Sequence, residues 1–307
     1  MTITSRRTFE YQRGIAGYAR ELLVFEQRMD ELDGRAIDRL CNARSLFLYT
    51  HDFDEFADAV WPRLATPPSI LVTHNSDGEV YTRHAEWLDH EGIGVRYWLA
   101  QNVTVAHPRL HPVPIGVANS MWPHGNLRSF ARAMRRAQRR RRAPGSLFAH
   151  FDASTHPARA AASDALRAHF PAQSVDPAPS LPWRRYLRRL GEHQFSACPR
   201  GNGIDTHRVW ESLYLGAIPV VERTVLSEHW TSCGLPMVLI DDWTEVTPDR
   251  LRHEAEVLKP PWTANAVRLS TYRAAVEAAA TARASPPRDA RAGSEQGGAE
   301  PPTRPAE

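Results

Sequence analysis

The sequence predicts an α/β protein of two domains, each built around a sheet of parallel strands. Short apolar runs such as LFLYT (46–50) and SILVT (69–73) alternate with longer stretches of helical periodicity. The alternation restarts at SLFAHF (146–151), after a strongly basic helical stretch at 126–143. The chain has 307 residues, 42% of them apolar, which is enough for two cores of ordinary size. Because this alternation is typical of open parallel sheets, we expect helices on both faces.

The first domain is expected to cover residues 1–145. It begins with a helix over residues 8–42, where apolar side chains recur at roughly helical spacing among charged residues. Its strands are expected at 46–50, 69–73, 95–102 and 111–116, and its further helices at 54–64, 84–92 and 126–143. Polar loops follow these strands, and ligands of open parallel sheets bind at that edge.

The second domain is expected to cover residues 146–283, with a disordered tail at 284–307 that is rich in Pro, Gly, Glu, Ala and Arg. Its strands are expected at 146–151, 194–199, 218–221 and 237–241, and its helices at 157–170, 183–193, 206–216 and over much of 243–282. Together the two domains leave a cleft between the carboxyl ends of their strands.

Composition and charge exclude several classes of protein. The formal net charge is only +3, which gives no general affinity for nucleic acid. The three cysteines, Cys41, Cys198 and Cys233, lie at no metal-ligand spacing, and their odd number argues against a disulfide framework. No apolar run is long enough for a transmembrane helix, and the first residues lack a secretory apolar region. We therefore expect a cytoplasmic protein, either free or peripheral to the inner membrane face.

The richest motif is FSACPRGNGIDTHRVWESLYLGAIPVV, residues 195–221. It predicts a buried strand, a glycine-rich turn, a helix and a second strand. Gly201 and Gly203 allow the backbone to approach a ligand closely, and Asp205 or Thr206 is a good N-cap for the helix. Free N–H groups and the positive dipole end at such a helix start suit a diphosphate.

Charged side chains crowd the same turn. Arg200 and Arg208 flank the helix start and could donate charge-assisted hydrogen bonds to phosphate. Asn202 lies in the turn between them, and the carboxylate of Glu211 could accept two hydrogen bonds from ribose hydroxyls. The simpler interpretation is a capped helix with surface ion pairs, but this density of polar groups at one turn favours a binding site.

The segment resembles the C-terminal motif of exostosin-like glycosyltransferases, a family with the GT-B fold. The likeness lies in a strand, the PRG-G pattern, a helix carrying Arg and Glu, and G-IPV. It implies two Rossmann-like domains facing a cleft, with helical N-terminal and C-terminal segments. It also implies an enzyme that moves a sugar from a nucleoside diphosphate sugar to a hydroxyl acceptor, and we expect the transfer to invert the anomeric carbon. The matching residues, which would hold the nucleotide sugar, are Arg200, Gly201, Gly203, Arg208 and Glu211.

The loop after the strand at 69–73 supplies candidates for the acceptor side. A transferase of the inverting type needs a base for the acceptor hydroxyl, and His74 and Asp77 are of the right type and place. Asn75, Gln101 and Asn102 also end strands and suit sugar hydroxyls. The alternative for the loop is a turn in which Asn75 and Asp77 bond local backbone. His51 and Asp52 form a rival pair.

Two other groups leave alternatives open. The loop with His150, Asp152, Ser154, Thr155 and Arg159 could close over the diphosphate or the base, or Ser154 or Thr155 could only cap the helix that follows. Asp52-Phe53-Asp54 matches a manganese-binding pattern of other glycosyltransferases, but its place favours a helix cap. We therefore expect no metal site and no cofactor other than the donor substrate.

One block of charge, Arg135 to Arg142, stands out. A solvated helix is the simpler interpretation, and peripheral contact with an anionic membrane, which would suit a lipid-linked acceptor, is the other. Nucleic-acid binding through this block is a third hypothesis, which the lack of basic excess elsewhere disfavours. The expected partners are a nucleotide sugar and a glycan, lipid-linked or small-molecule acceptor. A non-catalytic protein that binds nucleotide sugars is the alternative to an enzyme.

Overall fold

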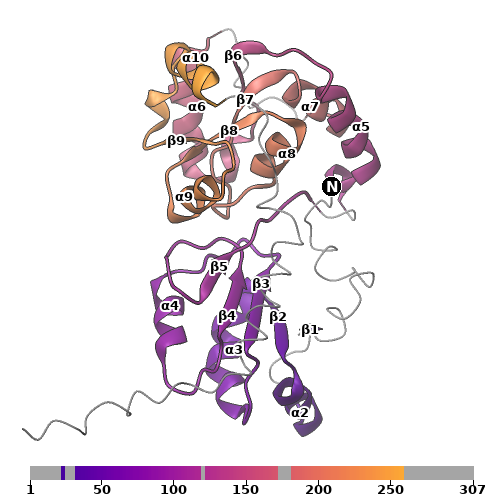
Figure 1. Ribbon diagram of the computed structural model, residues 1–307, viewed down its shortest axis with the longest axis vertical. Helices are drawn as coiled ribbons and strands as arrows, with labels where there is room; N and C mark the ends of the chain where they lie inside the picture. Colours follow the sequence, from indigo (N-terminus) through magenta and orange to yellow (C-terminus); the bar gives the residue numbers. More distant parts are fainter. Residues whose placement is uncertain (1–21, 25–31, 119–121, 172–180, 259–307) are drawn as a thin grey trace, which may run out of the picture.

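The computed structural model describes residues 22–24, 32–118, 122–171 and 181–258. Two parallel sheets with their helices lie one above the other (Figure 1). This α/β architecture of two parallel sheets agrees with the expected fold class. The tail expected at 284–307 and the helical region expected beyond residue 258 lie outside the described residues.

The first sheet has five strands, all parallel and in the order of the sequence. They are β1 (Leu22–Val24), β2 (Ser45–Tyr49), β3 (Ile70–His74), β4 (Tyr97–Ala100) and β5 (Leu110–Pro112). The helices are α2 (Gly34–Asn42), α3 (Phe53–Ala59) and α4 (Thr82–Asp89), with 3₁₀ turns at Thr50–Asp52 and Trp61–Arg63. The buried strands are runs of Leu, Ile, Val and Phe, as expected for strands covered on both faces.

The three helices described for the first sheet, α2, α3 and α4, cover the same face. Leu46 and Leu48 of β2 share an apolar cluster with residues of α2, α3 and α4, whereas Phe47 between them belongs to a different cluster. The expectation of helices on both faces is therefore wrong for the described part of this sheet. Because each strand is added on the same side of the last one, right-handed crossovers place every connecting helix on one face.

The second sheet has four parallel strands, again in sequence order. They are β6 (Ala143–Phe148), β7 (His193–Ala197), β8 (Ile218–Glu222) and β9 (Val238–Ile240). The helices are α5 (Leu127–Ala137), α6 (Pro157–His169), α7 (Trp183–Leu190), α8 (His207–Leu215), α9 (Val225–Ser232) and α10 (Pro248–Val257), with 3₁₀ turns at Pro123–Gly125, Ala153–Thr155 and Trp243–Glu245. Helices α6 and α10 pack on one face, and α5, α7, α8 and α9 on the other.

Two expectations need correction: where the first helix begins, and which sheet helix α5 packs with. Residues 22–24 form strand β1, and the helix begins only at Gly34 after an Asp33 cap, so a single helix over 8–42 is wrong. Helix α5 lies before the expected boundary at residue 145, yet it packs against α7 and α8 (Figure 1). The part of the chain that packs with the second sheet therefore begins before residue 145, at or before helix α5.

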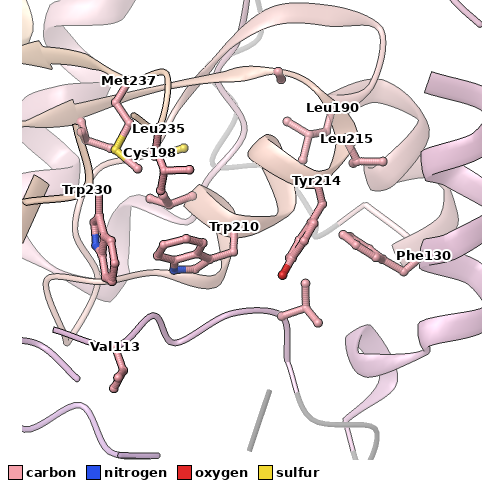
Figure 2. Packing of buried hydrophobic residues seen from close by; sticks show 14 of the residues in the cluster. Val113, Phe130, Leu190, Cys198, Trp210, Tyr214, Leu215, Trp230, Leu235 and Met237 are labelled. Atoms are coloured by element: carbon pink, nitrogen blue, oxygen red, sulfur yellow. The ribbon is translucent and has the colours of Figure 1, made fainter. Parts of the chain in front are cut away.

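Large aromatic rings fix helix α8 in the second domain. Trp210 meets Trp230 of α9 edge to face, with ring centroids 5.2 Å apart, and Tyr214 meets Phe130 of α5 at 5.9 Å (Figure 2). Each of these four rings is buried. Because rings of this size bury much apolar area, they hold α8 and its N-terminus in a defined place.

Candidate functional site

A cavity of about 710 Å³ lies where the loops after the strands of the two sheets meet. Most of its wall comes from the turn after β7, the start of α8, the loop after β6 and helix α7, and the first domain adds Asp77 and Ile115. Lining it are Asp77, Ile115, His124, His150, Phe151, Asp152, Thr155, Arg159, Leu181, Trp183, Tyr186, Gly201, Asn202, Gly203, Asp205, Thr206, His207, Arg208 and Glu211. Cavities of this size at the carboxyl ends of parallel strands are typical ligand sites.

The glycine-rich turn is closed by its own backbone. Gly201 N–H donates to the carbonyl of Gly203 at 3.0 Å, and a side chain at Gly203 would collide with the amide of Asn102. Helix α8 then begins at His207, with Thr206 in the N-cap position. The Thr206 hydroxyl makes no cap bond and has no partner within the described residues, so the expected side-chain cap is absent. An uncapped helix start can offer its N–H groups to an anion.

Arg208 is the least satisfied cation of this site. Its Nε and Nη1 are buried, and no described residue accepts a hydrogen bond from them. Its guanidinium carbon lies 5.4 Å from the centroid of the Tyr186 ring. Leaving buried N–H donors of a charged group unpaired costs stability, and an anion in the cavity would remove that cost.

Glu211 lies one helical turn beyond Arg208 and is almost fully buried. Its carboxylate accepts a hydrogen bond of 2.8 Å from the Tyr186 hydroxyl. Burial raises the pKa of Glu211, and the Tyr186 hydrogen bond and the charges of Arg208 and His124 partly oppose that rise. The group is therefore a buried acceptor with one phenol donor already in place.

Arg159 of α6 adds a second guanidinium to the wall. Its Nε donates to the carbonyl of Arg200 at 2.7 Å, and Nη1 donates to the carbonyl of Asp152 at 3.3 Å. Burial lowers the pKa of Arg159, and repulsion from Arg208 lowers it further. Two cations that repel each other across one cavity are a suitable frame for a multiply charged anion. The loop after β6 therefore contributes to this wall.

Asp205 joins the two domains. Its Oδ2 accepts from the backbone N–H of Ile115 at 2.7 Å, and its Oδ1 accepts from the indole of Trp210 at 2.8 Å. Its own N–H donates to Oδ1 of Asn102 at 2.9 Å. Burial raises the pKa of Asp205 to about 7. Its side chain thus faces protein groups and does not cap α8.

Arg200 is turned away from the large cavity. Its Nη2 lies 2.6 Å from Oε1 of Glu79 in an ion pair between the two domains, and it lines a separate, smaller cavity. The expected role of Arg200 in phosphate binding is therefore not supported by its place. Asn202 does line the large cavity, and its amide donates to Oδ2 of Asp77 at 3.1 Å.

His74 is buried in the first domain and does not line the cavity. Its Nε2 lies 3.1 Å from the carbonyl oxygen of Pro114, and its side chain is 1% exposed. A base for a bound acceptor must reach that acceptor, so the structure contradicts this candidate. Of the expected pair, only Asp77 faces the cavity.

The amides expected on the acceptor side brace the 75–78 loop instead. Gln101 accepts from the N–H of Asn75 at 2.9 Å and donates to the carbonyl of Ser76 at 3.0 Å. Asn102 donates to the carbonyls of Ser76 and Gly78, at 3.1 and 3.3 Å. Both amide side chains are completely buried, so neither is available to a sugar. Asn75, which has a left-handed φ of 59°, also lies outside the cavity wall.

His207 is an imidazole of the cavity wall that the sequence did not single out. Its Nδ1 lies 2.7 Å from the carbonyl oxygen of Gly116. Since a carbonyl oxygen only accepts, Nδ1 carries the proton and Nε2 is left with a lone pair. Burial lowers the pKa of His207, which favours this neutral form. Tyr186 and Trp183 of α7 were also missed, because nothing in a basic helix indicates which of its residues face a cavity.

The other candidate groups lie elsewhere. His51 and Asp52 are partly exposed, 3.5 Å apart, and outside the cavity wall. In the Asp52-Phe53-Asp54 pattern, the Asp52 side chain makes no cap bond to helix α3. The Asp54 carboxylate is hydrogen-bonded to Arg83 and His84, so it is not free to bind a metal. Across the ranges that the structure describes, no three His, Cys, Asp or Glu side chains gather as a metal site would require.

The chain matches no model of a known protein family and no curated protein sequence. Among the described helices, none has the length and apolar character needed to cross a bilayer.

Proposed function

We propose that this chain is a glycosyltransferase that binds a nucleoside diphosphate sugar in the large cavity and transfers the sugar to a hydroxyl group. The observation that carries the proposal is Arg208, whose half-buried guanidinium has two buried N–H groups, on Nε and Nη1, without an acceptor in the described part of the chain. It lies beside a helix start whose N-cap side chain makes no cap bond. Arg159 lines the same cavity as Arg208, and a cavity of about 710 Å³ can hold a nucleotide sugar. The likeness of residues 195–221 to exostosin-like enzymes points to the same class of ligand.

The diphosphate and the ribose of the donor each have complementary groups in this proposal. Arg208, Arg159 and the N–H groups at the start of α8 neutralise the diphosphate. The carboxylate of Glu211 accepts hydrogen bonds from the ribose hydroxyls, with the Tyr186 phenol holding it in place. Since two arginines and a helix end supply the positive charge, we expect donor binding to be unchanged by a chelator.

His207 takes the role of base that His74 cannot fill. Nε2 of His207 accepts the proton of the acceptor hydroxyl while that oxygen forms a bond to the anomeric carbon. The bond from the anomeric carbon to the diphosphate oxygen breaks, and the diphosphate leaves with the electron pair. Positioned cations stabilise that leaving group, and this electrostatic term is usually a large part of such catalysis. Attack from the side opposite the leaving group inverts the anomeric centre.

The first test is donor binding. A thermal-shift screen with a panel of nucleotide sugars identifies the donor, because a ligand of the folded state raises its apparent stability. Calorimetry then compares the wild type with Arg208→Ala and Glu211→Ala. We expect each to weaken binding at least about tenfold, since each removes charge-assisted hydrogen bonds.

Arg35→Ala and Glu256→Ala are the matched controls, because both side chains are exposed and far from the cavity wall. Unchanged donor affinity in both Arg208→Ala and Glu211→Ala would refute the site. His207→Asn separates catalysis from binding: we expect turnover to be lost while donor affinity is kept. A wild type that binds the donor but never transfers or hydrolyses it would be the non-catalytic alternative.

A further inference from the structure

Helices α5 and α7 pack side by side on the flank of the second domain (Figure 1). Residues 127–142 contain eight arginines and residues 183–190 contain four, and neither range contains an Asp or Glu. The whole chain has a net charge of only +3, so this flank is far more positive than the average surface of the protein. Such a local excess creates a potential that attracts anions.

A groove of about 370 Å³ runs between the two helices. Five arginines line it: Arg132, Arg136 and Arg140 from the α5 side, and Arg184 and Arg188 from α7. Small side chains form much of the remaining wall, and a Cβ on Gly191 would lie only 3.1 Å from that of Ala137. The groove is thus a concave site with guanidinium groups on both sides and short side chains between them.

Carboxylates balance little of this charge. Arg140 pairs with Glu192 at 2.6 Å, and Arg189 lies 4.0 Å from the same carboxylate. For the other four arginines of the groove, no carboxylate of the described chain lies within ion-pair distance. Arg142, in contrast, turns inward and donates to the carbonyl of Leu215. The charge block seen in the sequence therefore divides, and Arg184 and Arg188 of α7 add positive charge to the part of the block that lines the groove.

We propose that this groove binds a compact anion with several phosphate groups, such as an oligophosphate chain. Guanidinium groups match phosphate oxygens in bidentate geometry, and four of them without carboxylate partners can neutralise more than one phosphate. The small volume and the two-sided walls suit a short chain of phosphates better than a flat surface or a long polymer. The same chemistry occurs in soluble oligophosphates and in the phosphate headgroup of a lipid.

The groove is distinct from the large cavity, although one helix borders both. Trp183 and Tyr186 of α7 line the large cavity, whereas Arg184 and Arg188 line the groove. This proposal therefore does not depend on the proposed enzymatic function. An Arg208→Ala background weakens anion binding in the large cavity and so reduces its contribution to the binding measurement.

The test uses the full chain with Arg208→Ala and with the wild-type residue. Inorganic triphosphate is titrated by calorimetry, and vesicles of phosphatidylcholine with and without phosphatidylinositol bisphosphate, whose headgroup carries several phosphates, are tested by co-sedimentation. The groove variant is Arg132→Glu with Arg188→Glu. The control is Arg35→Glu with Arg96→Glu, which changes the net charge equally on exposed positions of the first domain.

We expect the groove variant to weaken binding of the phosphate probe at least about tenfold, and the control to bind like its parent. Triphosphate binding identifies a soluble ligand, and binding to phosphatidylinositol bisphosphate vesicles alone identifies a lipid headgroup. The proposal is wrong if neither probe binds, or if groove and control variants lose binding equally. Tighter, groove-dependent binding of single-stranded DNA that displaces triphosphate would overturn the compact ligand in favour of a polymer.

Discussion

Two loops meet at the large cavity, residues 75–78 after β3 and residues 199–206 after β7, and their polar groups are used differently. In the first loop, backbone groups are bonded by the buried amides of Gln101 and Asn102. In the second, the Thr206 hydroxyl and part of the Arg208 guanidinium just beyond it have no partner in the described chain. Both loops are rich in polar residues, yet only the second presents unsatisfied groups.

The difference shows that polar residues after parallel strands have two separate uses. A buried amide that satisfies several backbone groups stabilises a loop and cannot also bind a ligand. A buried cation without an acceptor costs free energy until an anion arrives. Asp205 belongs to the second loop, but like the residues of the first loop its polar groups are used within the protein, in hydrogen bonds to Ile115 and Asn102 of the first domain.

The largest effect we expect is the pH dependence that Asp205 contributes. Its folded pKa of about 7 lies above the ordinary 3.8, so the folded state binds the proton more tightly than the unfolded state. The contribution therefore favours folding most at low pH and declines as pH rises from about 4 to 7, by on the order of 4 kcal/mol. Urea unfolding of wild type and Asp205→Asn across this range measures it.

The informative quantity is the difference between the two proteins at each pH, because other groups titrate equally in both. We expect the wild type to lose stability relative to Asp205→Asn as pH rises. A constant difference would mean that the Asp205 carboxyl ionises normally in the folded protein. Its burial between the domains would then cost no stability as the pH rises.

The second effect tests the bracing amides. Asn102→Ala removes hydrogen bonds to Ser76, Gly78 and Asp205, and we expect it to lower the free energy of unfolding by about 3 kcal/mol. Asn102 has a left-handed φ of 54°, which alanine tolerates poorly. Asn102→Gly removes that backbone strain and is the control. If Asn102→Gly is as stable as the wild type in urea, the amide does not brace the loop.

The smallest effect concerns Arg200. Its ion pair with Glu79 is partly exposed, so Arg200→Ala should lower the free energy of unfolding by no more than about 1 kcal/mol. Because Arg200 faces away from the large cavity, we expect donor affinity to change less than about threefold, in contrast to Arg208→Ala. Calorimetry measures donor affinity in both variants. If Arg200→Ala and Arg208→Ala lose donor affinity equally, Arg200 does contribute to donor binding.

Much of the fold could be predicted from the chain alone. Runs such as those at β2, β3 and β8 are apolar and bounded by polar turns, so their strands were expected within a few residues. The strand at 22–24 was missed because LLV lies in a stretch with helical spacing, and its pairing with β2 depends on a distant segment. The order of strands, which places the first sheet's helices on one face, is likewise a tertiary property.

The site divides in the same way. Gly201, Gly203, Arg208 and Glu211 were expected from local spacing, and all four line the cavity. His74 was misplaced because a sequence does not show that a carbonyl forty residues later will accept from its ring. The other side chains missed, His207 and Tyr186, contact the site through packing between elements. Local patterns identify a turn and a helix start, but they do not identify which neighbours satisfy them.

The turn after β7 also carries hydrogen bonds between the two domains. Asp205 bonds Ile115 and Asn102, and His207 bonds Gly116, so the second domain grips the first through the same few residues that begin α8. A ligand bound at the start of α8 would therefore contact the same residues that hold the two domains together, and we expect its binding to strengthen the attachment of one domain to the other.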